Sequence, residues 1–154
     1  MLDAIKNFAP GFELGYTQWT TIPQEHINKF GEATNDTDPF HTDPKWAIKN
    51  SPFGGTLLYG FQTMSLLTSM CDEVFNLHGF EMDTSKDLLL NYGFNNLRLP
   101  APVKQSDPIR GKFTVSAIEN KGKGKILTLD VVIENKNSDR PALTAQWLCY
   151  WQKL

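Results

Sequence analysis

Apolar and polar residues alternate along the second half of the chain, which is the period of a strand with one buried face. The clearest alternation is in 125–136. One face of this segment carries Leu127, Leu129, Val131 and Ile133, and the other carries Thr128, Asp130 and Glu134. Three other runs of strand length, 87–99, 109–118 and 142–153, are separated by residues rich in proline, glycine or asparagine. We therefore predict four strands after residue 86.

The first half of the chain has helical periodicity after one short strand, predicted at about 14–21. Beyond that strand, Ile27, Phe30 and Ala33 recur at the spacing of one helix face. This pattern predicts a helix that ends near Asn35.

Two more helices are predicted before residue 80. Thr42 or Asp43 followed by Pro44 has the chemistry of a helix cap and first turn, and this helix should run to Ile48. The apolar run from about Thr56 to Phe75 is too long for a strand and is rich in leucine and methionine. We interpret it as a buried helix.

The order of these elements is one strand, then helices, then a run of strands, which predicts an α+β fold with the sheet wrapped around the buried helix. The chain has 154 residues, of which 40% are hydrophobic and 12% aromatic, enough for one domain with a substantial core. Internal repeats, low-complexity tracts and linker-like stretches are absent from the sequence. We therefore predict a single domain over 1–154.

Composition argues against several classes of function. The formal net charge is −2, the isoelectric point is near 5.9, and the charges are scattered, which disfavours nucleic acid or a membrane as partner. Cys71 and Cys149 lie far apart in apolar runs, which favours buried thiols in a reducing compartment. The sequence contains neither the apolar core of a signal peptide near residue 1 nor an apolar run of the roughly 18 residues that a membrane span needs. We expect a cytoplasmic protein.

Three carboxylates and a histidine stand within nine residues at 35–43, NDTDPFHTD. A calcium loop of the EF-hand type counted from Asp36 would need glycine and glutamate where the chain has His41 and Ala47. A phosphotransfer Asp-x-Asp follows a buried parallel strand, whereas this segment follows a predicted helix. Zinc would need more histidine or cysteine nearby. We therefore expect no metal and no cofactor.

Asp36 and His41 suit acid–base chemistry. Asp36 leaves a helix end and His41 lies five residues on, with Pro39 stiffening the turn, so both side chains can converge on one small volume. Two groups of different pKa in one cleft suit a reaction that removes one proton and delivers another. The alternative is structural, with the aspartates acting as caps and turn residues and the histidine satisfying a loop carbonyl.

A second constellation lies in 51–60, SPFGGTLLYG, which leads into the buried helix. Free amides and the positive dipole end of the first helical turn can hold a developing oxyanion. Gly60 has no side chain to block a carbonyl that approaches its N–H. The alternative is that these glycines only allow the helix to pack closely on the sheet.

Three segments together resemble the MaoC-like (R)-specific enoyl-CoA hydratases, in particular the branch of the nodulation protein NodN. They are 36–44, with its Asp-x-x-x-x-His-x-Asp-Pro spacing, then 51–67 and 91–111. The resemblance implies a hotdog fold, in which an antiparallel sheet wraps a central helix. It also implies a homodimer with acyl-CoA or acyl carrier protein thioester sites near the subunit interface.

The same resemblance implies roles for individual residues. Asp36 and His41 take the positions of the catalytic pair, and Gly60 takes that of the glycine whose amide polarises the thioester carbonyl. Further residues of the implied substrate site are Gly55, Tyr59 and Asp38. The implied reaction is reversible addition of water to a trans-2-enoyl-CoA, which gives the (3R)-3-hydroxyacyl-CoA.

Two residues depart from the family pattern. Many relatives have asparagine where this chain has Asp38, so a second carboxylate lies close to Asp36. Relatives usually have histidine before the helix glycine, where Tyr59 keeps a hydroxyl but not an imidazole. We expect both departures to affect substrate range and pH dependence more than reaction class.

Outside these motifs, Arg98 is either a structural ion pair or a contact to CoA. Trp147 and Trp151 share a strand face with other apolar residues, which indicates packing in the core or at an interface. We expect a partner subunit to cover this face.

Two rival functions are compatible with the same motifs. A hotdog acyl-CoA thioesterase would use the same thioester site, and a non-catalytic acyl-CoA-binding protein would keep the fold without turnover.

Overall fold

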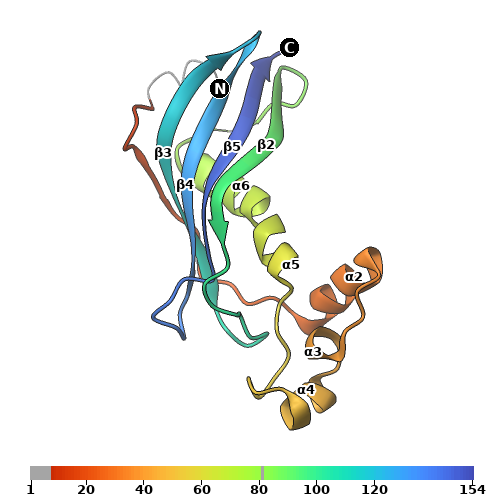
Figure 1. The fold of residues 1–154 in the computed structure, drawn as a ribbon. Helices are drawn as coiled ribbons and strands as arrows, with labels where there is room; N and C mark the ends of the chain where they lie inside the picture. Colours follow the sequence, from red (N-terminus) through yellow and green to blue (C-terminus); the bar gives the residue numbers. More distant parts are fainter. Residues whose placement is uncertain (1–7, 81) are drawn as a thin grey trace.

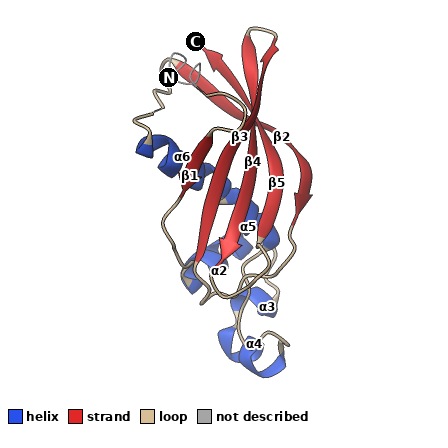
Figure 2. Cartoon of the chain, turned by 90° about the vertical axis from the view of Figure 1, so that its left-hand side faces the viewer, coloured by secondary structure: helices blue, strands red, loops and turns tan. Residues whose placement is uncertain are grey.

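One antiparallel sheet of five strands dominates the computed structural model, which describes residues 8–80 and 82–154. The strands are β1 (Glu13–Tyr16), β2 (Asp87–Arg98), β3 (Ile109–Lys121), β4 (Gly124–Asn135) and β5 (Leu143–Lys153). Their order across the sheet is β1-β3-β4-β5-β2, so β1 and β2 form its edges. Figures 1 and 2 show α5 (Gly60–Ser65) and α6 (Leu67–Leu77) lying along one face of the curved sheet. The predicted α+β fold of the hotdog type is confirmed.

The first strand is shorter than predicted. Only Glu13–Tyr16 is continuous strand, and its pairing with β3 shifts register at Gly15, whose φ of 101° favours glycine. Thr20 then pairs with Ile109 in an isolated bridge. The predicted segment therefore follows β3 but does so in two pieces.

The central helix comprises α5 (Gly60–Ser65) and α6 (Leu67–Leu77), joined by Leu66 in a right-handed helical conformation. It begins four residues later than predicted, because the chain before it is extended. Leu57 pairs with Lys104 in an isolated bridge, and the Leu58 N–H donates to the Val103 carbonyl at 2.9 Å. Within the described parts of the chain, no helix is both long and apolar enough to cross a membrane.

The core lies between the sheet and this helix. The predicted inward face of β4, from Leu127 to Ile133, is at most 1% exposed. Trp147 and Trp151 are only 2% and 1% exposed within a single chain, so the expectation that a partner covers them is wrong. Their indole N–H groups donate to the side chains of Asn91 and Asp87 on β2. These tryptophans anchor the edge strand β2 to β5.

The two cysteines, Cys71 on α6 and Cys149 on β5, are free thiols in the core, as predicted. Burial raises the pKa of both, that of Cys149 to about 12.

Three short helices form a separate helical segment, which we define as residues 24–50. They are α2 (Gln24–Thr34), α3 (Pro39–Thr42) and α4 (Pro44–Asn50). They lie together beyond the start of α5, at one end of the sheet (Figure 1). The ends of α2 and α4 agree with the sequence prediction, whereas α3 was not predicted, because four residues are too few for a periodic pattern.

Candidate active site

Asp36 lies directly after the end of α2. Asn35 adopts a left-handed conformation (φ 57°) and closes the helix, and the Asp36 N–H then donates to the Gly31 carbonyl at 2.9 Å. The Asp36 side chain is exposed, and one of its carboxylate oxygens lies 3.4 Å from the Asp38 N–H. The helix end therefore presents a carboxylate whose backbone is fixed.

Asp38 starts the next helix. Its carboxylate accepts a hydrogen bond from the Phe40 N–H at 2.9 Å, and Pro39 occupies the first helical position. Asp43 caps α4 in the same way, through the Trp46 N–H. For these two aspartates, the structure contains the caps that the structural interpretation predicts.

His41 stands in α3 with one ring nitrogen engaged. Its Nδ1 lies 2.9 Å from the carbonyl oxygen of Leu57. A carbonyl can only accept, so Nδ1 carries the hydrogen and Nε2 of the neutral ring is an acceptor. The Leu57 N–H in turn donates to the Phe40 carbonyl at 3.0 Å. The His41 ring thus satisfies the Leu57 carbonyl, as the structural interpretation expects. This bond does not use Nε2, which can accept a proton.

Gln24 ties this region together and was missed in the sequence. Its amide nitrogen donates to the His41 carbonyl at 2.6 Å, and its amide oxygen accepts from the Thr56 hydroxyl at 2.6 Å. One side chain thus connects α2, α3 and the extended segment before α5. No periodicity or spacing distinguishes such a residue, because its partners lie 17 and 32 positions away.

Tyr59 contacts both members of the predicted pair. Its ring stacks on the His41 imidazole with centroids 3.8 Å apart, and its hydroxyl donates to the backbone carbonyl of Asp36 at 2.5 Å. The side chain is buried, and this burial, together with the Asp36 and Asp38 carboxylates, raises the pKa of Tyr59. The hydroxyl therefore stays protonated and remains a donor.

Gly60 is the first residue of α5, so its N–H has no acceptor within the helix. A Cβ there would lie 2.6 Å from the Cδ1 atom of Leu99, so this exposed side chain packs closely on Gly60 and would have to shift. Both sequence interpretations of Gly60 thus have support. Gly55, in contrast, lines a pocket of 270 Å³ with Gln24, Ile48 and Lys104.

Known proteins resemble this chain over most of its length. Residues 6–137 match the family model described as "MaoC like domain". The chain belongs to the MaoC-like domain family. "Nodulation protein N" of Rhizobium leguminosarum bv. viciae is 39% identical over 139 residues, which cover 90% of this chain and 83% of that protein. "3-hydroxyacyl-thioester dehydratase Z" of Mycobacterium tuberculosis is 34% identical over 139 residues, which cover 90% and 87%.

Solved structures show the same MaoC-like fold. The (R)-hydratase from A. caviae superposes with a TM-score of 0.70 at 19% identity, and the match covers 94% of this chain and 97% of that one. At this identity the likeness concerns the fold alone.

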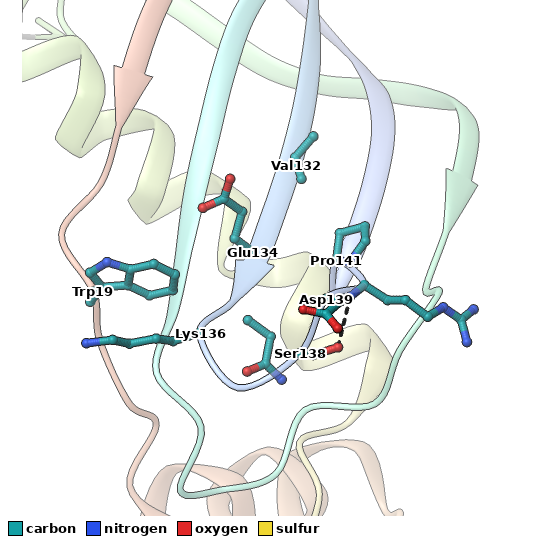
Figure 3. Close-up of a pocket in the computed structure, with 9 residues that line it drawn as sticks. Trp19, Val132, Glu134, Lys136, Ser138, Asp139 and Pro141 are labelled. Atoms are coloured by element: carbon teal, nitrogen blue, oxygen red, sulfur yellow. Dashed lines mark hydrogen bonds between the residues drawn. The ribbon is translucent and has the colours of Figure 1, made fainter.

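A larger pocket of this MaoC-like chain lies elsewhere, on the outer face of the sheet (Figure 3). It has a volume of 390 Å³ and is lined by Trp19, by β4 and by the loop after β4. Glu134, one of its carboxylates, is paired with Arg110 at 2.7 Å. This pocket contains none of the predicted site residues.

Two further expectations from the sequence concern Arg98 and a bound metal ion. The exposed Arg98 ends β2, and its guanidinium donates to the neighbouring Leu97 carbonyl at 2.8 Å. Within residues 8–80 and 82–154, no three histidine, cysteine or acidic side chains gather where they could hold a metal ion.

Proposed function

We propose that this protein is an (R)-specific hydratase that adds water reversibly to trans-2-enoyl thioesters, with Asp36 and His41 as the acid–base pair. The observation that carries the proposal is the Nδ1 hydrogen bond of His41 to the Leu57 carbonyl, which leaves Nε2 as the proton acceptor. Membership of the MaoC-like family and the 34% identity to a protein named a 3-hydroxyacyl-thioester dehydratase support the same reaction.

The reaction places distinct demands on the site. Water attacks C3 of the enoyl group, and the π electrons move through C2 onto the thioester oxygen. The N–H of Gly60, at the start of α5, donates to this oxygen as its charge develops. The electrons then return to form the C2–H bond, so water is added as hydroxyl at C3 and hydrogen at C2.

Asp36 and His41 carry out the proton transfers of the proposed reaction. The Asp36 carboxylate accepts a hydrogen bond from the water, and Nε2 of His41 accepts the proton that the attacking water loses. A proton from the pair then reaches C2. The reaction consumes no oxidant or reductant and needs no cofactor.

We further propose that the protein works as a cytoplasmic homodimer on thioesters of CoA or acyl carrier protein. The support is the edge strand β2, which is 12 residues long and exposes Leu90 (48%) and Tyr92 (54%). A long edge of this kind invites pairing with a second copy. Light scattering should give twice the chain mass, and a monomer mass at working concentration would contradict the dimer.

A chain-length series of trans-2-enoyl-CoA substrates tests the proposed reaction. We expect loss of the enoyl absorbance and, by chiral analysis, a (3R)-3-hydroxyacyl product. Release of free thiol without hydration would indicate a thioesterase instead. Tight acyl-CoA binding with neither reaction would indicate a non-catalytic binding protein.

A further inference from the structure

We propose that Tyr59 is a positioning residue that fixes the imidazole of His41 relative to the backbone of Asp36, with Gly31 providing the space that its hydroxyl needs. The catalytic consequence of this inference rests on the proposed hydratase function. The positioning itself rests on contacts between described residues, and it can be tested without measuring turnover.

The ring of Tyr59 fixes the plane of the imidazole. The two rings are 3.8 Å apart at an interplanar angle of 26°, and the Phe30 ring lies 5.2 Å from the Tyr59 ring. The hydrogen bond from Nδ1 to the Leu57 carbonyl fixes the rotation of the imidazole within that plane. Nε2 is thereby aimed in one direction before any substrate binds.

The hydroxyl of Tyr59 contacts the backbone of Asp36, the other residue of the pair. It donates to the backbone carbonyl of Asp36, the residue that leaves the end of α2. A single rigid side chain therefore joins the backbone of the carboxylate to the ring of the base. Neither end of this connection depends on the exposed side chain of Asp36 itself.

Gly31 explains how the hydroxyl reaches this carbonyl. A Cβ at position 31 would overlap the Tyr59 hydroxyl and would lie 2.6 Å from the Asp36 carbonyl oxygen. Gly31 is a buried residue inside α2, where glycine is unfavourable relative to alanine. The space it leaves is filled by the tyrosine contact, so we infer that positions 31 and 59 act together.

Two substitutions separate the parts of this arrangement. Tyr59→Phe keeps the ring stack but removes the hydrogen bond, and we expect kcat to fall about tenfold with KM unchanged. Tyr59→Leu removes both contacts and should lower kcat further. The matched control is Tyr150→Phe, which removes a tyrosine hydroxyl bonded to Gln152 on the sheet and should leave kcat unchanged.

A double-mutant cycle tests the link to Gly31. Gly31→Ala should lower kcat in the natural chain, and it should lower kcat by a smaller factor when Tyr59 is already phenylalanine. Equal factors in the two backgrounds would overturn the coupling. If Gly31→Ala does not fold, the Tyr59 variants alone decide the proposal.

The imidazole ¹⁵N spectrum of His41 supplies a measurement independent of turnover. At a pH where the ring is neutral, we expect the tautomer protonated at Nδ1 in the natural chain and a mixture of the two tautomers in Tyr59→Leu. A natural chain without hydratase activity would refute the proposed function while leaving this spectrum as the test of positioning. Unchanged tautomers and unchanged kcat in both Tyr59 variants, or a change in KM alone, would overturn the positioning role.

Discussion

The sheet with its central helix and the helical segment at 24–50 are held together by different interactions. The sheet and helix enclose large apolar side chains, among them Phe113 and Trp151, each at most 1% exposed. The helical segment buries only Ile27, Gly31 and Ala47, and the Gln24 side chain joins it by hydrogen bonds to residues distant in the sequence. The candidate site residues Asp36 and His41 thus stand on the segment with fewer buried side chains, which meets the common core through Ile27. The comparison predicts that substitutions in the two regions have separable effects.

The largest expected effect is on activity and comes from the helical segment. Asp36→Asn and His41→Ala should each lower the hydration rate about 10²- to 10⁴-fold, the usual contribution of an acid–base group. Circular dichroism and the thermal midpoint should stay near those of the natural chain, since the Asp36 side chain is exposed and that of His41 is only half-buried. A folded variant with near-natural rates would remove the pair from the mechanism.

A substitution in the core should instead lower stability and leave kcat unchanged. Phe113→Ala should destabilise the fold by about 3–5 kcal/mol, because it leaves a cavity beneath the central helix. Urea unfolding measures this loss. At temperatures where the variant remains folded, its kcat should match that of the natural chain, and a large drop in kcat would show that core and site are not separable.

An intermediate effect is expected where the helical segment meets the extended chain at Thr56. Gln24→Ala removes the hydrogen bonds to the His41 carbonyl and to the Thr56 hydroxyl, each worth ~1 kcal/mol. We expect a lower kcat together with a modest loss of stability, measured on one preparation. Gln18→Ala, in the exposed chain after β1, is the matched control.

The smallest expected effect comes from substitutions of Asp38, which distinguish its role from that of Asp36. Asparagine can cap a helix as aspartate does, so Asp38→Asn should retain activity and stability, whereas Asp38→Ala should cost about 1 kcal/mol through loss of the cap on α3. Thermal unfolding and initial rates measure both. If Asp38→Asn is as inactive as Asp36→Asn, the catalytic role has been put on the wrong aspartate.

The sequence predicts the buried elements of the sheet and central helix better than features that depend on contacts between distant residues. The alternation in β4 and the apolar run of α6 reflect burial against one core, so period alone identifies both. The start of the central helix was misplaced, because the extended conformation of 56–59 depends on pairing with residues 103 and 104. The burial of Trp147 was predicted, but its location in the core rather than under a partner depends on the whole sheet.

The sequence predicts the residues of the candidate site but not the contacts that support them. The spacing of Asp36 and His41, with the resemblance to the MaoC-like hydratases, pointed to the pair. The roles of Gln24 and Gly31 could not be derived, because each acts through a partner at least five positions away along the chain. Hydrogen bonds between distant residues leave no period in a sequence.

The two buried thiols have a practical consequence. The thiolate is the form that reagents attack, and the raised pKa values of Cys71 and Cys149 keep both sulfurs protonated near neutral pH. The chain has only these two cysteines. A single cysteine introduced at exposed Lys49 on α4 would therefore react alone, and a dye or spin label attached there would report the surroundings of α4 without a signal from the core.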